Sequence, residues 1–380
     1  MKILLNAFPL LAPKSGVGYY TYHLLHALRR LYAERDSFVY FYGRRFSTAI
    51  AERPPALDAA ARRALKSVFD NPYRFTQPVK EFIFRCGAAV VRPDLYHETN
   101  YVLMPFRGPR VVTVFDMSVK RFPETHPPAR VRFFNAWFDC RLGDADHIIT
   151  ISESAKRDIV EIMGVRPEVV TVTHLAPPPS FARPDEAALA AFRTAKGLEQ
   201  PFLLYVGNLE PRKNLEMLVR AYAALVHRKP AAPRLVLAGE PSWLSDPLFA
   251  EIDRLGLRDR VLLPGYVPED ELPLWYSTAL AFLYPSRYEG FGLPVVEAMA
   301  CGSPVLCANA SSLPEVAGDA AVLLPPDDEE AWTNGMDEIE ESVERRVLLR
   351  DKGMRRAALF SWDRCAKETH AVYERVVHSS

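Results

Sequence analysis

Cysteine is scarce in this chain, and its few cysteines do not form closely spaced pairs. Five occur among 380 residues, an odd number, and no two have the C-x-x-C spacing. Disulfide-stabilised secreted domains are richer in cysteine, and structural zinc sites use closely spaced pairs. The sequence therefore predicts a reduced, cytoplasmic protein without a disulfide framework or a zinc knuckle.

Long hydrophobic runs and internal repeats are also missing. No stretch reaches the ~18 apolar residues of a membrane-spanning helix, and the apolar run within residues 1–6 is too short for a signal sequence. No self-similarity recurs at the periods of solenoid proteins. We therefore expect a globular protein that does not cross a membrane.

Net charge is absent overall but not locally. Lys plus Arg and Asp plus Glu both number 47, so no global field favours nucleic acid. Residues 44–92, however, hold ten Lys or Arg against four acids, which is net +6, and aromatic residues lie between them: Phe69, Tyr73, Phe75, Phe82 and Phe84. This segment is either a solvated helical face or a peripheral contact with an anionic membrane, at the inner face of the plasma membrane.

What the chain does contain is a repeated alternation of short aliphatic runs and amphipathic stretches. At 380 residues, about two domains are expected. The alternation is typical of βαβ units. We predict an α/β fold with two Rossmann-like, doubly wound parallel-sheet domains facing a cleft. The expected strands are 3–6, 38–41, 95–98, 111–115, 147–151, 169–172, 202–206, 234–238, 261–263, 281–284, 304–307 and 321–323.

A proline-rich segment, residues 175–184, separates the two halves. Proline fixes φ and removes a backbone donor, so neither a helix nor a central strand is expected there. We therefore predict domains at 1–178 and 185–380. A final helix is expected over 361–376, after a Ser361 N-cap, and the pattern leaves open whether it packs on its own domain or crosses back to the first.

The most informative stretch is residues 287–304, which follow a predicted strand and open a predicted helix. Gly290 and Gly292 free the backbone to approach a ligand just before the helix, where unpaired amides favour an anion. Glu289 lies in this loop, where a donor sugar would lie, and Glu297 lies near the first helical turn, where it could accept hydrogen bonds from a ribose. Two carboxylates could thus meet one ligand.

A second constellation, residues 205–214, has the same order of strand end, glycine turn and helix start. It carries Arg212 and Lys213. Cations near a helix N-terminus oppose its dipole unless an anion lies between them. A guanidinium and an ammonium could stabilise a departing nucleoside diphosphate without Mg²⁺.

Together these residues resemble the retaining glycosyltransferases of family 4, which have the GT-B fold. The E-x7-E pattern, the Gly-Phe-Gly-Leu-Pro loop, the Arg-Lys pair and the later Leu-Pro-Glu-Val-Ala-Gly segment occur in the family's order. The resemblance implies that Arg212 and Lys213 bind the donor diphosphate, Glu297 the ribose and Glu289 the transferred sugar. It further implies backbone approach at Gly290, Phe291, Gly292 and Leu293 and a nucleobase pocket beside Val267.

In the first half, Gly16 and Gly18 resemble the family's glycine turn after the first strand, which implies that Gly16 lies close to the phosphates. The family's His-Asp segment is matched by Phe115 and Asp116, so the histidine position carries phenylalanine. Asp116 and His97 are the remaining catalytic candidates of this half, beside Glu289. For His97, a hydrogen-bonded histidine at a strand end is an equally weighted alternative.

No metal ligand set is predicted. Asp144 and Asp146 mimic a D-x-D motif but precede a strand, at the end away from the expected cleft, and His23 and His26 share a helix face without a third ligand. We expect no cofactor besides the donor substrate.

The predicted activity is transfer of a hexose, with retention and without a metal, from a nucleotide-diphosphate donor to a glycan or lipid-linked oligosaccharide. The pairing of residues 206–214 with 115–118 resembles bacterial polysaccharide mannosyltransferases, which favours GDP-mannose. A UDP-sugar donor, a nucleotide-sugar epimerase and a non-catalytic GT-B binding subunit are the alternatives. The acceptor would bind mainly to the first domain and the donor to the second.

Overall fold

The structure, a computed structural model, describes residues 1–11, 16–51, 73–241 and 244–379. The chain forms two compact units. The first comprises Met1–Leu175 together with Ser361–Ser380, and the second comprises Ala176–Phe360. The change from one unit to the next, after Leu175, falls in the proline-rich segment. No helix or strand of the described structure runs through residues 176–185.

The first unit is built on a sheet with the order β3-β2-β1-β4-β5-β6-β7. All neighbours are parallel except β3, which is antiparallel to β2. The strands are β1 (Lys2–Asn6), β2 (Ser37–Phe41), β3 (Phe46–Ser47), β4 (Leu95–Glu98), β5 (Arg110–Thr113), β6 (His147–Thr150) and β7 (Val170–Val172).

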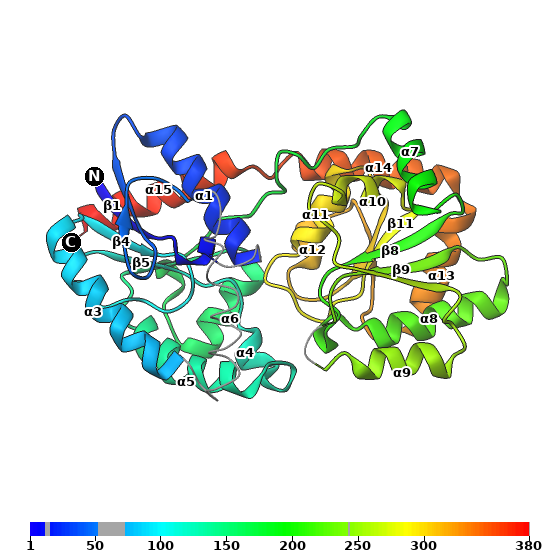
Figure 1. Cartoon of the computed structure of the whole chain (residues 1–380), viewed down its shortest axis with the longest axis horizontal. Coiled ribbons are helices and arrows are strands. Elements are labelled where there is room, and N and C mark those ends of the chain that lie inside the picture. Colours follow the sequence, from blue (N-terminus) through cyan, green and yellow to red (C-terminus); the bar gives the residue numbers. More distant parts are fainter. Residues whose placement is uncertain (12–15, 52–72, 242–243, 380) are drawn as a thin grey trace. The chain divides into compact units, whose positions relative to one another are not determined.

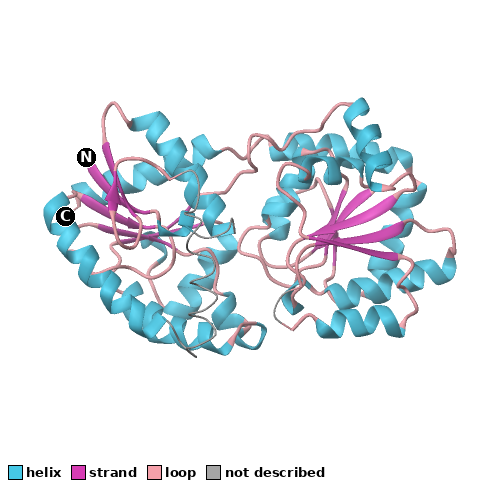
Figure 2. Cartoon of the chain, in the orientation of Figure 1, coloured by secondary structure: helices cyan, strands magenta, loops and turns pink. Residues whose placement is uncertain are grey.

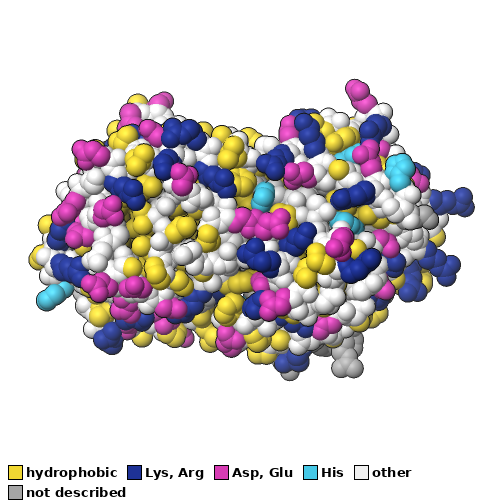
Figure 3. All heavy atoms as spheres, turned by 180° about the vertical axis from the view of Figure 1, so that it is seen from behind, with side chains coloured by type: hydrophobic (Ala, Val, Ile, Leu, Met, Phe, Trp, Pro, Cys, Tyr) yellow, Lys and Arg dark blue, Asp and Glu magenta, His cyan; other side chains and the backbone are white. Residues whose placement is uncertain are grey.

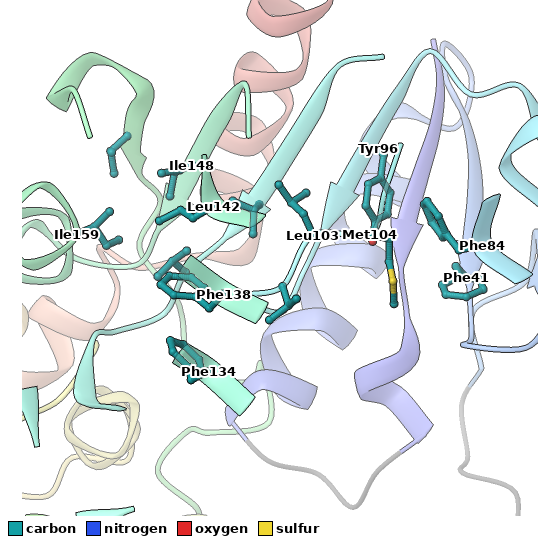
Figure 4. Close-up of a cluster of buried hydrophobic side chains, with 14 of the residues drawn as sticks. Phe41, Phe84, Tyr96, Leu103, Met104, Phe134, Phe138, Leu142, Ile148 and Ile159 are labelled. Atoms are coloured by element: carbon teal, nitrogen blue, oxygen red, sulfur yellow. The ribbon is translucent and has the colours of Figure 1, made fainter. Parts of the chain in front are cut away.

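Helices cover both faces of this sheet (Figure 1). The longer ones are α1 (Gly16–Tyr32), α3 (Tyr73–Val91), α5 (Pro128–Leu142), α6 (Glu153–Met163) and α15 (Trp362–His378), with the short α4 (Ser118–Arg121) and the 3₁₀ turns η1 (Phe8–Leu11), η2 (Pro123–Thr125) and η3 (Pro167–Val169). Under α3 and α5 the core is aromatic: Phe84 and Phe138 are fully buried and pack among Phe41, Tyr96 and Ile148 (Figure 4).

The final helix belongs to the first unit. Ser361 accepts a hydrogen bond from the Arg364 amide at 3.2 Å and so caps α15. The helix packs along α1, where Trp362 stacks on His23 with centroids 4.9 Å apart. In the middle of the helix, His370 lies 2.6 Å from the Asp36 carboxylate.

The second unit has a wholly parallel sheet with the order β10-β9-β8-β11-β12-β13. Its strands are β8 (Phe202–Val206), β9 (Arg234–Ala238), β10 (Val261–Gly265), β11 (Ala281–Tyr284), β12 (Val305–Ala308) and β13 (Val322–Leu324). Its helices, cyan in Figure 2, are α7 (Glu186–Lys196), η4 (Pro211–Lys213), α8 (Leu215–Arg228), α9 (Asp246–Arg254), α10 (Leu272–Thr278), α11 (Leu293–Ala300), α12 (Leu313–Ala317), α13 (Glu329–Glu341) and α14 (Val343–Ala357).

The predicted fold class is confirmed, because in both units helices flank a sheet that is parallel apart from β3, and every expected strand overlaps an observed one. The sequence missed β3, which has two residues and is too short to show a period. The expected strand 111–115 was also placed too late, since β5 ends at Thr113.

The interpretation of residues 44–92 as one amphipathic surface is corrected in part. Phe84 is fully buried in the first unit's core, whereas Phe82 is 69% exposed. Phe69 and the charges at 52–72 lie outside the described residues, as do the side chains of Tyr73 and Phe75. In Figure 3, positive and negative side chains are interspersed over the visible face. Among the described residues, no helix has the length and apolar character that spanning a membrane requires.

Candidate functional site

The second sheet has a topological switch point between β8 and β11. The chain adds β9 and β10 on one side of β8, and then β11, β12 and β13 on the other. The loops after β8 and β11 therefore lead away in opposite directions. Open α/β sheets bind ligands at the carboxyl ends of strands flanking such a point.

The loop after β8 is shaped by glycines that approach one another closely. A Cβ on Gly239 would lie 1.8 Å from the Gly207 carbonyl oxygen, so only glycine fits there. The chain then forms η4 and turns at Asn214, whose φ is +59° and whose side-chain amide donates to the Pro326 carbonyl at 2.6 Å. This turn fixes Arg212 and Lys213 before α8 begins.

The loop after β11 is anchored on the start of α12. The Glu289 amide donates to Ser311 Oγ at 2.8 Å, and Ser312 Oγ donates to the Glu289 carbonyl at 3.0 Å. Gly292 has a φ of +97° at the N-cap of α11, and a Cβ there would lie 2.6 Å from Leu313 Cδ2. Glycine at this position lets α11 begin directly behind the loop.

The two loops bring Arg212, Lys213 and Glu289 into contact. Lys213 Nζ lies 2.5 Å from Glu289 Oε1, and Arg212 Nη1 lies 3.4 Å from the same oxygen. Arg212 also pairs with Glu210 at 2.5 Å and donates to the Tyr288 carbonyl. Arg212 and Lys213, which precede Glu289 by 77 and 76 positions in the sequence, thus form one cluster with it at the switch point.

The two cations of this cluster favour the ionised form of Glu289. Burial alone would raise the pKa of Glu289, but the charges of Lys213 and Arg212 outweigh it and lower the pKa to about 2. Burial lowers the pKa of Lys213, and Glu289 opposes that shift. Lys213 also donates to the Tyr284 hydroxyl at 2.9 Å. Two cations are therefore held largely out of water with two carboxylates, Glu289 and Glu210, beside a helix N-terminus.

Glu297 is the fifth residue of α11 and lies directly after its first turn, near the predicted place. Its side chain is 8% exposed and accepts a hydrogen bond from the Tyr276 hydroxyl at 3.1 Å. Burial raises the pKa of Glu297 to about 7. This carboxyl changes charge near neutral pH, unlike Glu289.

The remaining predicted residues of the second unit lie on the same edge of its sheet. Val267 follows β10, after Gly265 with a φ of +73°, and is 8% exposed beside the exposed Tyr266. Gly290 and Phe291 are buried, and Phe291 packs edge-on against Phe360 at 5.6 Å. Leu293 is the first residue of α11.

In the first unit, His97 is not placed to contact a substrate, which corrects its assignment as a catalytic candidate. It is fully buried in β4, with Nδ1 2.6 Å from the Tyr373 hydroxyl and Nε2 2.8 Å from Thr113 Oγ1. Burial lowers the pKa of His97 to about 3. It is a neutral histidine that ties β4 to β5 and α15.

The other first-unit candidates lie in the loop after β5 and at the start of α1. Asp116 is half-buried and accepts the Ser118 amide at 2.8 Å, and the preceding Phe115 packs edge-on against Tyr20 at 5.0 Å. Gly16 is the exposed first residue of α1, and Gly18 is buried within it.

Sequence reasoning missed the hydroxyl groups that support the charged cluster. Ser286 Oγ donates to Glu289 at 2.6 Å. The Tyr284 hydroxyl accepts a hydrogen bond from Lys213, and the Tyr276 hydroxyl donates one to Glu297. The tyrosines end or precede apolar runs, where a core position is the default interpretation, so no sequence signal identified them. Within the described ranges, no group of three or more His, Cys, Asp or Glu could hold a metal ion.

Two family models match the chain. Residues 14–176 match "Glycosyltransferase Family 4", and residues 189–356 match "Glycosyl transferases group 1". O-antigen chain mannosyltransferase B of Escherichia coli is 32% identical over 98% of this chain and all of its own length. The serotype-specific mannosyltransferase WbdA of the same species is 31% identical over 62% of this chain, which spans 29% of that longer protein.

Solved structures share the fold at low identity. Sucrose-phosphate synthase from Thermosynechococcus elongatus has a TM-score of 0.75 at 22% identity and covers 100% of both chains. WaaG, a glycosyltransferase involved in lipopolysaccharide biosynthesis, has a TM-score of 0.73 at 15% identity, covering 98% of this chain and 99% of its own. With the full-length relative and the two parallel-sheet units, these matches establish that the chain belongs to glycosyltransferase family 4 and has the GT-B fold.

Proposed function

We propose that this glycosyltransferase is a metal-independent, retaining mannosyltransferase that uses GDP-mannose. The observation that carries the proposal is the cluster of Arg212, Lys213 and Glu289 at the switch point of the second sheet. It stands beside Gly292, where α11 begins. A donor diphosphate would lie against this helix end and these cations.

The cations supply what departure of a nucleoside diphosphate requires. Negative charge grows on the leaving phosphate as the bond to the sugar breaks. Fixed donors in a water-poor site stabilise such charge by ~3 to 4 kcal/mol each. Lys213 is 9% exposed and Arg212 14%, so both are largely removed from water before any substrate arrives. No metal is needed for this step.

Glu289 and Glu297 would take different parts of the donor. With a pKa of about 2, Glu289 stays anionic, holds the two cations in place and lies where the transferred sugar would bind. Glu297, with a pKa of about 7, would accept hydrogen bonds from the ribose diol in its ionised form. The phosphate oxygen of the leaving group would act as base toward the acceptor on the same face, which retains configuration.

The choice of mannose and GDP rests on the relatives. O-antigen chain mannosyltransferase B matches the chain from end to end, and WbdA is also called a mannosyltransferase. A UDP-hexose is the second candidate, because the solved HepE structures from Anabaena are described as complexes with UDP and with UDP-glucose. The acceptor we propose is a glycan or lipid-linked oligosaccharide of a cell-surface polysaccharide.

A peripheral contact with an anionic membrane would bring the enzyme to such an acceptor. On α3, Val79, Phe82 and Val90 are 59%, 69% and 83% exposed, and Arg85 is exposed among them. Apolar side chains beside cations are the mixture that binds lipid headgroups.

The first test is a thermal-shift panel with GDP, UDP, ADP and their sugars. Because a ligand that binds the native state raises the Tm, a selective shift with GDP and GDP-mannose is expected. A shift with UDP alone would replace GDP-mannose by a UDP-sugar. No shift with any nucleotide would favour a non-catalytic GT-B subunit.

The second test follows the reaction itself. Radiolabelled donor identifies acceptors, and NMR of the product should show the donor's anomeric configuration. Activity should survive EDTA, and an absolute Mg²⁺ or Mn²⁺ requirement would overturn the metal-independent proposal. Arg212→Ala should lower kcat by ~100-fold or more, whereas Arg258→Ala, 76% exposed in the same unit, should leave it unchanged.

A further inference from the structure

A cavity lies at the edge of the second unit's sheet opposite to the Arg212–Lys213–Glu289 cluster. It has a volume of about 370 Å³ and is bounded by Pro201, Leu280 and Pro304, which directly precede β8, β11 and β12. The Arg212–Lys213–Glu289 cluster follows the carboxyl ends of β8 and β11. Strands of four or five residues separate these edges by roughly 13 to 17 Å, at about 3.3 Å per residue. The cavity is therefore distinct from the proposed donor site.

Four arginines line this cavity: Arg183, Arg193, Arg346 and Arg350. One acidic residue, Glu199, lines it with them, so the lining carries a net charge of +3. Glu186 pairs with Arg183 at 2.7 Å, but its side chain is 72% exposed and lies outside the lining. The pKa of Glu186 is lowered by Arg183 first and also by Arg193 and Arg350, so these guanidinium groups act on the same region.

Two of the arginine side chains converge on Gly302. A Cβ at this glycine would lie 3.3 Å from Arg350 Cγ and 3.5 Å from Arg183 Cδ. The side chains are only 35% and 27% exposed. Each has a partly exposed carboxylate partner, Glu186 at 2.7 Å from Arg183 and Asp351 at 3.8 Å from Arg350, and neither carboxylate lines the cavity. An anion in the cavity would add compensation where these like charges meet.

Neighbouring carbonyls fix the positions of the guanidinium groups. Arg183 Nη1 donates to the Ser277 carbonyl at 3.1 Å, and Arg346 Nη1 donates to the carbonyls of Ile339 and Glu340 at 2.6 and 2.7 Å. Those two carbonyls lie in the last turn of α13. A preorganised fork of guanidinium donors matches the oxygens of a phosphate group better than ammonium groups do.

The cavity also has room for more than an anion. Its volume is within the ~300 to 1,000 Å³ range of small-molecule sites. On its α14 side, Val343 and Val347 are 55% and 39% exposed. These side chains would pack against the non-ionic part of a phosphorylated ligand.

We propose that this cavity is a second ligand site, which binds the phosphate group of a small molecule or of a lipid headgroup through Arg183, Arg193, Arg346 and Arg350. The site is independent of the donor site and of the choice between GDP and UDP. Its occupation would stabilise the second unit by binding its native state.

The test compares four forms of the full-length protein: wild type, Arg193→Gln/Arg350→Gln, the control Arg355→Gln, and Arg212→Ala. Arg355 is exposed on the same helix, α14, and does not line the cavity. Arg212→Ala weakens the proposed donor site. Arg193→Gln alone serves if the double variant fails to fold.

The probes are inorganic pyrophosphate, followed by Tm, and phosphatidylcholine vesicles with and without phosphatidic acid, followed by flotation. If the site binds a free phosphate, pyrophosphate should raise the Tm of wild type, Arg355→Gln and Arg212→Ala. The double variant Arg193→Gln/Arg350→Gln should need at least tenfold more pyrophosphate for the same rise in Tm. Vesicle binding that needs phosphatidic acid and is lost in the double variant, without a pyrophosphate response, assigns the site to a lipid headgroup.

Two outcomes would overturn the proposal. One is a pyrophosphate response that the double variant keeps, above all if Arg212→Ala removes it, or vesicle binding that the double variant keeps without any pyrophosphate response, because the α3 surface would then account for the vesicle binding. The other is no response of the wild-type protein to either probe.

Discussion

Lys213→Met tests whether the buried cation of the cluster serves both the fold and the reaction. Methionine keeps the length and apolar stem of lysine but leaves Glu289 without the ammonium at 2.5 Å. Glu289 would still have Arg212, whose Nη1 lies 3.4 Å away. The variant should therefore lose stability without unfolding, and it should lose activity.

The size of the stability loss follows from the pKa of Glu289. Its shift from 4.5 to about 2 corresponds to ~3 kcal/mol of net stabilisation of the ionised form, at ~1.36 kcal/mol per pKa unit. Because Arg212 retains part of this, and because burial of the Lys213 ammonium is itself unfavourable, as its lowered pKa indicates, we expect Lys213→Met to lower the free energy of unfolding by ~1 to 2 kcal/mol at pH 7. A buried carboxylate that loses a partner accounts for the loss.

The assay is urea unfolding together with donor turnover. Glu289→Gln in the Lys213→Met background removes the buried carboxylate that lost its nearest cation, so it should recover part of the stability. The kcat should stay ~100-fold or more below wild type because the Lys213 cation is still missing. Lys352→Met is the matched control, since Lys352 and Asp319 form a surface pair at 2.7 Å that is worth at most ~1 kcal/mol.

The pH dependence of stability tests independently whether ionised Glu289 stabilises the fold. A carboxyl group with a lowered folded-state pKa stabilises the protein above its unfolded pKa, and this stability is lost as the pH falls from about 4.5 to about 2. Lys213→Met should reduce this loss. Wild-type stability and turnover in Lys213→Met would refute the reasoning, since the cation would then serve neither the fold nor the leaving group.

Three further outcomes are expected. Since Glu297 has a pKa raised to about 7, its contribution to stability should fall as the pH rises from about 4.5 to 7, while the KM for the donor should fall as the pH rises through 7. Glu297→Gln should flatten both pH profiles. An unchanged KM profile in this variant would remove Glu297 from donor binding. In urea unfolding, Gly292→Ala should lower the free energy of unfolding by ~1 to 2 kcal/mol for its positive φ, and further for the clash with Leu313, and it should weaken donor binding. In the control Gly256→Ala, a Cβ at φ +65° meets open space, so only the cost of the positive φ is expected. Phe82→Ser should reduce sedimentation with anionic vesicles at low salt without changing turnover of a water-soluble acceptor; equal sedimentation would support a solvated α3 face.

Local pattern was sufficient for the parallel α/β units because strands buried on both faces read as short aliphatic runs. Residues 202–206 and 281–284 match β8 and β11 residue for residue. Their lengths are set by turns that glycine or proline make visible in the sequence. β3 has no such signal, since its two residues pair with β2 only after the chain has folded back.

The charged residues of the candidate site were predicted, but their mutual contacts were not. The strand–glycine–helix order indicated Arg212, Lys213 and Glu289 individually. It did not indicate that Lys213 pairs with Glu289, or that Glu289 is held by Ser286, because such distances depend on how two loops leave neighbouring strands. His97 shows the same limit, since its partner Tyr373 lies 276 residues later.

The two α/β units, the family and the two loops that carry the proposed donor site could be predicted from the sequence, because these depend on residue type and local spacing. Which side chains are buried and which charged groups form pairs depends on the tertiary structure. It made His97 a core residue, gave Glu289 and Glu297 opposite pKa shifts, and gathered Arg183 and Arg350 over Gly302. Burial and charge pairing are set by contacts between distant segments, and no local pattern encodes them.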